Sequence, residues 1–171
     1  ELLKNACGDE VTGALLLDIK QGRFIAVEAA ATLVATGGGP TQYRIFAPGP
    51  EKSVDGMGML YRAGAVMRDM EMLQFHPTGL IVPGSVVAGC LLEEGLRGAG
   101  AYLYNGKGER YMQRYAPETA ERATRDVVSR SAFLEMTAGR ACKEGGVHIV
   151  ASHLGPEFVE KTFPGMCARC R

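Results

Sequence analysis

The chain has 171 residues, of which 46% are hydrophobic and 22% are charged, the proportions of an ordinary globular protein with one medium domain or two small lobes. Its 19 basic and 19 acidic side chains balance, so no net field would attract nucleic acid or an anionic membrane surface. No apolar run approaches the roughly 18 residues that a transmembrane helix needs, and no signal-peptide pattern opens the sequence. Because the sequence begins without Met and stops in mid-pattern, we expect a fragment of a longer protein.

The two apolar runs nearest the start of the chain, residues 13–19 and 24–35, predict strands on either side of a tight turn. The second run ends in Ala35-Thr36-Gly37-Gly38-Gly39, where successive glycines would let the backbone approach a ligand closely. A plain loop is the alternative, and three glycines by themselves favour it.

The next predicted element is a helix over residues 55–68, where apolar side chains follow helical spacing. Its three glycines each lower the intrinsic helix preference by up to about 1 kcal/mol relative to alanine. A short apolar run at 70–75 then leads into His76-Pro77. Because Pro77 restricts His76 to an extended conformation, we expect this histidine at a strand end, facing a loop.

In the second half of the chain, a glycine-rich turn after Asn105 predicts a hairpin between strands at 101–105 and 110–115. A longer helix follows, starting between Pro117 and Thr124. Its predicted buried face holds Val127, Ser131, Leu134 and Ala138, widened by Val128 and Ala132. The remaining predicted elements are a strand at 147–151 and a short helix at 156–163 that opens with proline.

The five cysteines are an odd number in a chain too long to need disulfide staples, which indicates free thiols in a reducing compartment. Cys167 and Cys170 form a C-x-x-C pair, but neither a second pair nor a nearby histidine completes a zinc site. We therefore expect no metal site.

Three segments concentrate side chains that could act together: residues 74–79, 93–100 and 125–130. Glu94 and Arg97 stand three residues apart, so one helical turn would place them side by side in a hydrogen-bonded ion pair. A histidine and two arginines that meet at a pocket would suit a small dianion, because guanidinium binds carboxylate through two parallel hydrogen bonds. Surface ion pairs, each contributing about 0–1 kcal/mol, are the alternative, and spacing alone favours neither interpretation.

With these motifs, the sequence resembles the flavoprotein subunits of succinate dehydrogenase and fumarate reductase and the related L-aspartate oxidases. The resemblance covers essentially the whole chain, and the number, order and spacing of the matching motifs make coincidence improbable. The motifs are Ala35-Thr36-Gly37-Gly38, Asp55-Gly56, Arg62-Ala63-Gly64-Ala65, Asp69-Met70-Glu71, Gln74 to Gly79, Glu94 to Gly98, Asn105 with Gly108-Glu109-Arg110, Arg125 to Arg130, and His153-Leu154-Gly155.

The resemblance implies an α+β architecture in two parts. Residues 1–74 would be the C-terminal portion of an FAD-binding domain, and residues 75–171 would be the capping domain that closes over the substrate. The cofactor would be FAD, and its site would be incomplete in this chain. The residues implied to lie near the flavin are Ala35, Thr36, Gly37, Gly38 and Asp55.

The implied reaction is hydride transfer between flavin N5 and a four-carbon dicarboxylate, which interconverts succinate and fumarate. His76 matches the histidine that binds a substrate carboxylate. Arg125 matches the arginine that delivers or removes the proton, and Glu94 with Arg97 matches the relay that connects it to solvent. An alternative role for Arg125 is an electrostatic clamp, because guanidinium, with a pKa above about 12, is not expected to lose its proton.

Two positions depart from the family pattern. Glu93 replaces the usual threonine, which donates its hydroxyl to a substrate carboxylate, and an extra acid there would repel a dianion unless it is turned away or protonated. Ala99 replaces a usual glutamate. Both departures leave open which dicarboxylate the site binds.

The chain also lacks the G-x-G-x-x-G segment that binds the FAD pyrophosphate and the family's later His/Arg pair. We therefore expect the chain alone to be inactive and to bind FAD weakly or not at all. The resemblance implies an iron–sulfur subunit as a candidate partner of the parent protein. It also implies a cytoplasmic location, at the inner face of a membrane where partner subunits anchor the complex, without direct membrane insertion.

Two other functions stay open. An L-aspartate oxidase would convert aspartate to iminoaspartate for NAD biosynthesis. A non-catalytic interaction module could keep a capping-like lobe without its chemistry, although such a module would be expected to have a degraded site.

Overall fold

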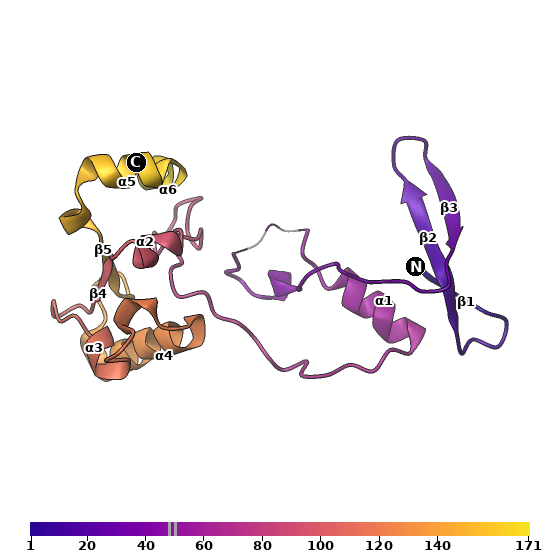
Figure 1. Cartoon of the computed structure of the whole chain (residues 1–171), viewed down its shortest axis with the longest axis horizontal. Helices are drawn as coiled ribbons and strands as arrows, with labels where there is room; N and C mark the ends of the chain where they lie inside the picture. The colour runs from indigo at the N-terminus through magenta and orange to yellow at the C-terminus, as the bar shows by residue number, and fades with distance from the viewer. Residues whose placement is uncertain (48, 50) are drawn as a thin grey trace. The chain divides into compact units, whose positions relative to one another are not determined.

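The computed structural model describes residues 1–47, 49 and 51–171. The chain forms two compact units, residues 1–72 and residues 73–171, and each is described by itself (Figure 1). The mixture of helices and strands agrees with the expected α+β class. The boundary between the units lies two residues before the expected one, and the assignment of the units as FAD-binding and capping domains stays a prediction.

The first unit contains an antiparallel sheet with the strand order β1-β2-β3. Its strands are β1 (Leu2–Lys4), β2 (Val11–Asp18) and β3 (Arg23–Glu28). The expected tight turn joins β2 to β3, and it is closed by a 2.8 Å hydrogen bond from the Gly22 N–H to the Asp18 carbonyl. Gly22 has a φ of 63°, a value that glycine adopts without steric cost.

The second predicted strand is shorter than expected, because β3 ends at Glu28 instead of near Ala35. The Ala29 N–H makes one last bond to Thr12, and β2 begins at Val11, so residues beyond this point have no facing strand. Residues 29–39 therefore carry no regular structure until the short 3₁₀ turn η1 (Pro40–Gln42).

The predicted helix of this unit is α1 (Asp55–Ala63), which ends five residues earlier than expected. Gly64 terminates it with a φ of 91°, in the left-handed conformation that commonly closes a helix. At the other end, Gly56 is buried and packs on Thr36. A Cβ atom at Gly56 would lie 1.8 Å from the Thr36 Oγ1, so only glycine permits this contact.

The second unit contains a two-stranded antiparallel sheet surrounded by short helices (Figure 1). Its longest helix is α4, followed by a π-helical turn, η3. The elements are α2 (Gly95–Gly98), β4 (Tyr102–Tyr104), α3 (Met112–Tyr115), η2 (Ala120–Arg122), α4 (Arg125–Glu135), η3 (Met136–Arg140), β5 (His148–Val150), η4 (Ser152–Leu154), α5 (Pro156–Thr162) and α6 (Pro164–Cys170).

The predicted hairpin partner of the strand at 101–105 is wrong. Strand β4 pairs with β5, with Leu103 opposite Ile149, whereas residues 110–115 contribute one isolated bridge and then begin α3. The turn itself is present, closed by a 3.0 Å bond from the Gly108 N–H to the Asn105 carbonyl. The glycine-rich sequence after Asn105 therefore predicts the turn correctly, but the strands predicted to pair across it do not form a hairpin.

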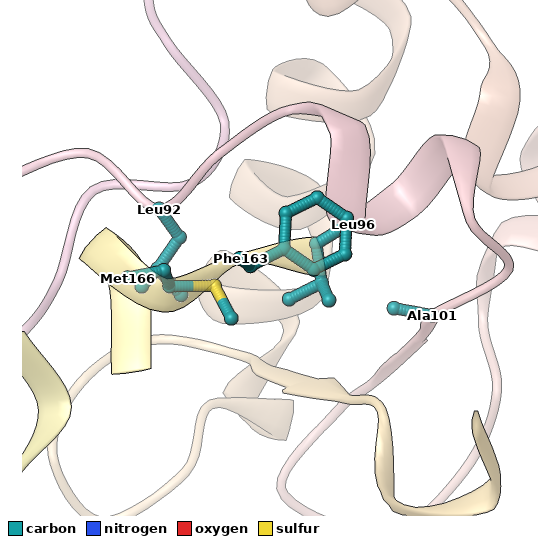
Figure 2. Close-up of a cluster of buried hydrophobic side chains, with 5 residues drawn as sticks. All are labelled: Leu92, Leu96, Ala101, Phe163 and Met166. Atoms are coloured by element: carbon teal, nitrogen blue, oxygen red, sulfur yellow. The ribbon is translucent and has the colours of Figure 1, made fainter. Parts of the chain in front are cut away.

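Two hydrophobic clusters hold this unit together. In the first, the Phe163 ring lies over Leu96 and Met166 lies beside Leu92 (Figure 2). A Cβ atom at Gly95 would lie 3.1 Å from the Phe163 ring, so the glycine at the start of α2 allows this ring to pack closely. The second cluster holds Leu103, Tyr111, Met112, Val128 and Ala132.

The predicted buried face of the long helix is confirmed in part. Val128, Ser131 and Ala132 are buried, but Leu134 is 42% exposed. The fully buried side chain of the last turn is that of Glu135, which hydropathy did not predict. Within the described part of the chain, no helix combines the length and apolar character needed to span a bilayer.

Candidate functional site

The first part of the site is the segment that carries His76. Thr78 is buried and ties this segment to the residues before α2. Its hydroxyl donates to the Leu92 carbonyl at 3.0 Å, and its own carbonyl accepts from the Leu92 N–H at 2.9 Å. The Thr78 Oγ1 also lies 3.2 Å from the His76 Nδ1. Thr78 therefore fixes both the path of the chain and the orientation of the imidazole ring.

The second part of the site is a carboxylate shared by two guanidinium groups. Glu94 immediately precedes α2, Arg97 lies on α2, and Arg125 is the first residue of α4. The Arg97 Nη2 donates to the Glu94 Oε1 at 2.7 Å, and the Arg125 Nη2 donates to the Glu94 Oε2 at 2.7 Å. The Glu94 Oε1 also accepts from the Arg125 Nε at 3.2 Å, so this oxygen contacts both arginines. The three side chains form a continuous line of hydrogen bonds.

Each arginine has further anchors. The Arg97 side chain is 3% exposed, and its Nη1 donates to the main-chain carbonyls of Glu121 and Ala123. The Arg125 Nη1 donates to the Gln74 side chain at 3.0 Å. Arg97 is therefore the buried end of the line, whereas Arg125, with 41% of its side chain exposed, is the open end.

Glu121 fixes the turn that holds Arg97. Its carboxylate is 4% exposed and accepts hydrogen bonds from Arg110 at 2.6 and 2.8 Å and from the Leu103 N–H at 3.2 Å. Burial opposes ionisation of Glu121, but these hydrogen bonds outweigh it and lower the pKa of the carboxyl. The anionic Glu121 therefore connects β4 and Arg110 to the turn whose carbonyls bind Arg97.

The charges of the site follow from the directions of its pKa shifts. Burial, followed by the charge of Arg125, lowers the pKa of His76 below its usual value, so the imidazole is neutral near pH 7. The hydrogen bond from Arg125 lowers the pKa of Glu94, which is therefore ionised. With two protonated guanidiniums and one carboxylate, the group carries a net positive charge that favours an anion.

The two arginines respond to their surroundings in opposite directions. Burial lowers the pKa of Arg97, whereas the hydrogen bond to Glu94 raises the pKa of Arg125. Proton loss is therefore easier at the buried end of the line than at the open end.

Four of the five residues predicted for catalysis or substrate binding thus meet in one place. His76 is close enough to Glu94, Arg97 and Arg125 for all three charges to shift its pKa. Glu93, the fifth, is an exposed neighbour of Glu94 and takes no part in the hydrogen-bond line. The ion pairs are linked to one another and to a buried arginine, which distinguishes them from isolated surface pairs.

The residues predicted to lie near a flavin belong to the first unit, and only two of them meet there. Thr36 and Asp55 line one open pocket of about 530 Å³, together with Glu1, Ser53 and Arg62. Gly37 has a φ of 76°, and a Cβ atom built at Gly38 would have no neighbour within 4 Å. The backbone at these two glycines is therefore open to close approach by a ligand. Ala35 does not line the pocket that holds Thr36 and Asp55.

Three residues that sequence reasoning left without a role contribute to the site. Gln74 binds Arg125, and Glu121 fixes the turn that holds Arg97. Ser129 on α4 donates to the Phe75 carbonyl at 2.9 Å and so attaches the His76 segment to α4. Gln74 and Ser129 lie inside motifs already singled out, but Glu121 had no signal, because its partners Arg110 and Leu103 are distant in sequence.

Comparisons with known proteins match these features. A family model described as an FAD binding domain matches residues 1–171. An uncharacterized FAD-dependent oxidoreductase of Methanocaldococcus jannaschii is 44% identical, over 90% of this chain and 28% of that protein. The succinate dehydrogenase flavoprotein subunit of Rickettsia bellii is 40% identical, over 92% of this chain and 26% of that protein.

A solved structure of E. coli quinol fumarate reductase with a mutation in FrdA has a TM-score of 0.79 and 34% identity, over 98% of this chain and 30% of that chain. This chain therefore spans less than a third of the length of the proteins that it matches.

Proposed function

Because the chain belongs to the FAD-binding domain family, we propose that the protein of which it forms part is an FAD-dependent oxidoreductase that interconverts succinate and fumarate. The observation that carries this proposal is the line Arg97–Glu94–Arg125 beside His76, with contacts of 2.7 Å on each side of the carboxylate. The resemblance to these flavoproteins implies site roles for the same four residues.

The substrate class follows from the charge and donors of the site. A neutral imidazole and the guanidinium of Arg125 both donate hydrogen bonds, and the group carries net positive charge, which suits a carboxylate. Gln74 and Glu94 hold the Arg125 fork on one side, which leaves the exposed part of this side chain free to face a ligand. A short dicarboxylate could bind His76 with one carboxylate and place its reacting carbons near Arg125.

The first unit offers some of the contacts that FAD would need. FAD, the cofactor of the family, would supply the hydride chemistry when bound. Thr36 and Asp55 offer polar side chains, and Gly37 and Gly38 leave space for a ligand against the backbone. The pyrophosphate-binding segment lies outside this chain, so we propose that the chain alone binds FAD weakly and is inactive.

In the reduction of fumarate, one substrate carbon gains a hydride and its neighbour gains a proton. Arg125 would give its proton to that neighbouring carbon, while Glu94 passes a proton to Arg125 and receives one from Arg97. Solvent would then return a proton to the line through Glu94, whose side chain is 43% exposed, because Arg97 is buried. The Glu94 carboxylate already contacts both arginines, so each proton within the line moves along an existing hydrogen bond. Oxidation of succinate would run the same line in reverse.

Such a coupled transfer answers the difficulty that guanidinium is a very weak acid. The raised pKa of Arg125 excludes a resting state with a neutral Arg125, but a concerted shift needs no such state. The alternative is that Arg125 only stabilises charge developing on the substrate. Replacement of Glu94 by glutamine tests the relay, because a relay needs a group at this position that carries a proton, whereas a clamp needs only an oriented Arg125, which Gln74 also holds.

For the whole protein, we further propose a cytoplasmic location and an electron-transfer partner subunit, with an iron–sulfur protein as the candidate. The similarity to a quinol fumarate reductase supports a route by which electrons travel between the flavoprotein and a quinol. In such a complex the flavoprotein would lie at the inner face of a membrane without inserting into it.

The experiment that tests the function is a substrate comparison with the parent protein. We expect fumarate reduction with a reduced dye and succinate oxidation with an oxidised one, and no turnover of aspartate. Oxidation of aspartate to iminoaspartate would instead identify an L-aspartate oxidase. Loss of all activity in a parent protein with stoichiometric FAD would favour a non-catalytic module and overturn the proposal.

A further inference from the structure

A short hairpin between η3 and β5 brings together side chains that the proposed redox chemistry does not use. The Cys142 N–H donates to the Gly146 carbonyl at 2.8 Å, and the Gly145 N–H donates to the Cys142 carbonyl at 2.9 Å. Gly145 turns the chain with a φ of 89°. Three residues after Gly145 the chain enters β5 at His148, so the turn and the strand lie next to each other.

The backbone of this hairpin is held in place on two sides. Gly106 donates its N–H to the Arg140 carbonyl at 2.7 Å, and a Cβ atom there would lie 2.1 Å from the Ala141 carbonyl oxygen. On the other side, a Cβ atom at Gly146 would lie 2.3 Å from the Ile81 Cδ1. Because both glycines are in close contact, the loop cannot shift far without losing packing.

Three side chains of the hairpin and strand present donor atoms to a common point. One sulfur atom of Cys142, one carboxylate oxygen of Glu144 and one ring nitrogen of His148 all lie within 4.8 Å of one another. The Cys142 thiol also makes a hydrogen bond to the Glu144 carboxylate, and the Lys143 Nζ lies 3.5 Å from the Glu144 Oε1.

We propose that Cys142, Glu144 and His148 form a binding site for a divalent cation of the Zn²⁺ class. A thiolate, an imidazole and a carboxylate are the ligand types that zinc accepts, at roughly 2.0–2.3 Å from the metal. Ca²⁺ and Mg²⁺ require sets of oxygen ligands and do not fit. The contact between thiol and carboxylate is replaced when the cation displaces the thiol proton.

Three protein ligands leave the fourth tetrahedral position to water, and the exposure of Glu144 and His148 gives the ion an open path. The bound ion would link the turn to β5 and so stabilise this end of the second unit. The sequence pattern C-x-x-C indicates Cys167 and Cys170 as a candidate metal-binding pair. Cys142, Glu144 and His148 do not match a common metal-binding spacing, so the sequence did not predict this site.

The test is a Zn²⁺ titration of the full chain by calorimetry, with Co²⁺ spectroscopy as a second readout. We expect one equivalent of Zn²⁺, and Co²⁺ should produce the intense charge-transfer absorption of a thiolate ligand. Cys142→Ser and His148→Gln should each weaken binding at least about tenfold, as loss of one of three ligands implies. Circular dichroism of each variant checks that the fold is retained.

The matched control is the double variant Cys167→Ser/Cys170→Ser, which removes the other cysteine pair and should leave binding unchanged. If this control loses the ion while Cys142→Ser keeps it, the site lies on α6 and the proposal is wrong. Weak binding without fixed stoichiometry, equal in all variants, would show an adventitious ion only and would also overturn it.

Discussion

Arg97 is the residue on which the geometry of the site depends most, because it is the only member of the line that is buried. Its guanidinium is held between Glu94 and two main-chain carbonyls. Arg125, by contrast, is oriented only by side chains, Gln74 and Glu94. A buried anchor and an adjustable outer arginine suit a site in which the outer group meets the substrate.

Arg125→Lys in the parent protein tests whether the guanidinium fork is needed. Lysine keeps the charge but cannot hold Glu94 and Gln74 at the same time through a planar group. We expect kcat for fumarate reduction to fall about 100-fold or more, the effect of removing one well-placed donor. Arg130→Lys is the control, since Arg130 is exposed and forms a 3.7 Å ion pair with the exposed Asp126. Near-normal turnover of the Arg125 variant would remove Arg125 from the mechanism.

Glu121→Gln tests the buried pair that supports Arg97. The amide of glutamine has only one accepting oxygen and no negative charge. Arg110 therefore loses one of its two hydrogen bonds and its anionic partner. Breaking a buried pair of this kind typically costs about 3–5 kcal/mol. We therefore expect the free energy of unfolding, measured by urea denaturation, to fall by about 3 kcal/mol.

Glu118→Gln, on the same segment but exposed, should change the free energy of unfolding by less than about 0.5 kcal/mol. Equal stability of the two variants would mean that Glu121 has no structural role. In the parent protein, Glu121→Gln should also reduce kcat more than KM changes, because it acts on the position of Arg97 and not on the substrate.

At the scale of elements, the second unit is organised around one acid. Glu135, at the end of α4, is fully buried. Its carboxylate accepts hydrogen bonds from four side chains, Asn105, Arg114, Tyr115 and Arg140. It therefore ties α4 to the turn after β4, to α3 and to the end of η3. The hydrogen bond from Arg140 is the main reason that the pKa of Glu135 is lowered.

This depressed pKa makes a specific prediction for stability against pH. A carboxyl whose pKa is lower in the folded state contributes stability above its unfolded pKa, near 4.5, and that stability is lost as the pH falls further. We expect the free energy of unfolding of the native chain to decrease as the pH falls below about 4.5. In Glu135→Gln the free energy of unfolding should be lower than in the native chain at every pH above about 4.5. Its decrease below about pH 4.5 should also be smaller. An unchanged acid dependence in the variant would contradict the role of Glu135.

The sequence was informative about local structure but not about which segments pair. Spacing of apolar residues located α1 and the face of α4, and the Gly-rich turn after Asn105 was found. The partner of β4 could not be predicted, because β5 lies more than 40 residues away and is only three residues long. Glu135 was missed because a charged residue at a helical core position reads as exposed until its partners are known.

The sequence identified four residues that the structure brings together, but not the residues that position them, for a physical reason. His76, Glu94, Arg97 and Arg125 belong to motifs whose residue types are unusual together, so their resemblance to known flavoproteins identified them. The residues that position them, Thr78 and Glu121, use buried hydrogen bonds to main-chain atoms. Such bonds depend on the path of the chain and leave no pattern in the sequence.

At the scale of the whole molecule, the proposed relay and the proposed cofactor contacts lie in different units. Glu94, Arg97 and Arg125 lie within the second unit together with His76, whereas the glycines and Asp55 predicted for FAD lie in the first. Since the chain spans less than a third of its relatives, the remaining FAD contacts are expected from segments outside it.

This division predicts how the chain alone behaves with FAD. After incubation with excess cofactor and desalting, we expect far less than one equivalent of flavin absorbance to remain with the protein. The parent protein, treated in the same way, should retain about one equivalent, as the family's cofactor requirement implies. Stoichiometric flavin on the chain alone would show that the pocket at Thr36 and Asp55 is sufficient for binding.

The most direct test of the relay compares two adjacent acids in the parent protein. Glu94→Gln keeps the shape of the side chain and one accepting oxygen but cannot carry a proton, whereas Glu93→Gln changes a neighbour outside the line. We expect Glu94→Gln to lower kcat for fumarate reduction about 100-fold or more, with KM for fumarate changed less than about threefold. Glu93→Gln should retain most of kcat. Equal and near-normal turnover in both variants would show that no proton passes through Glu94.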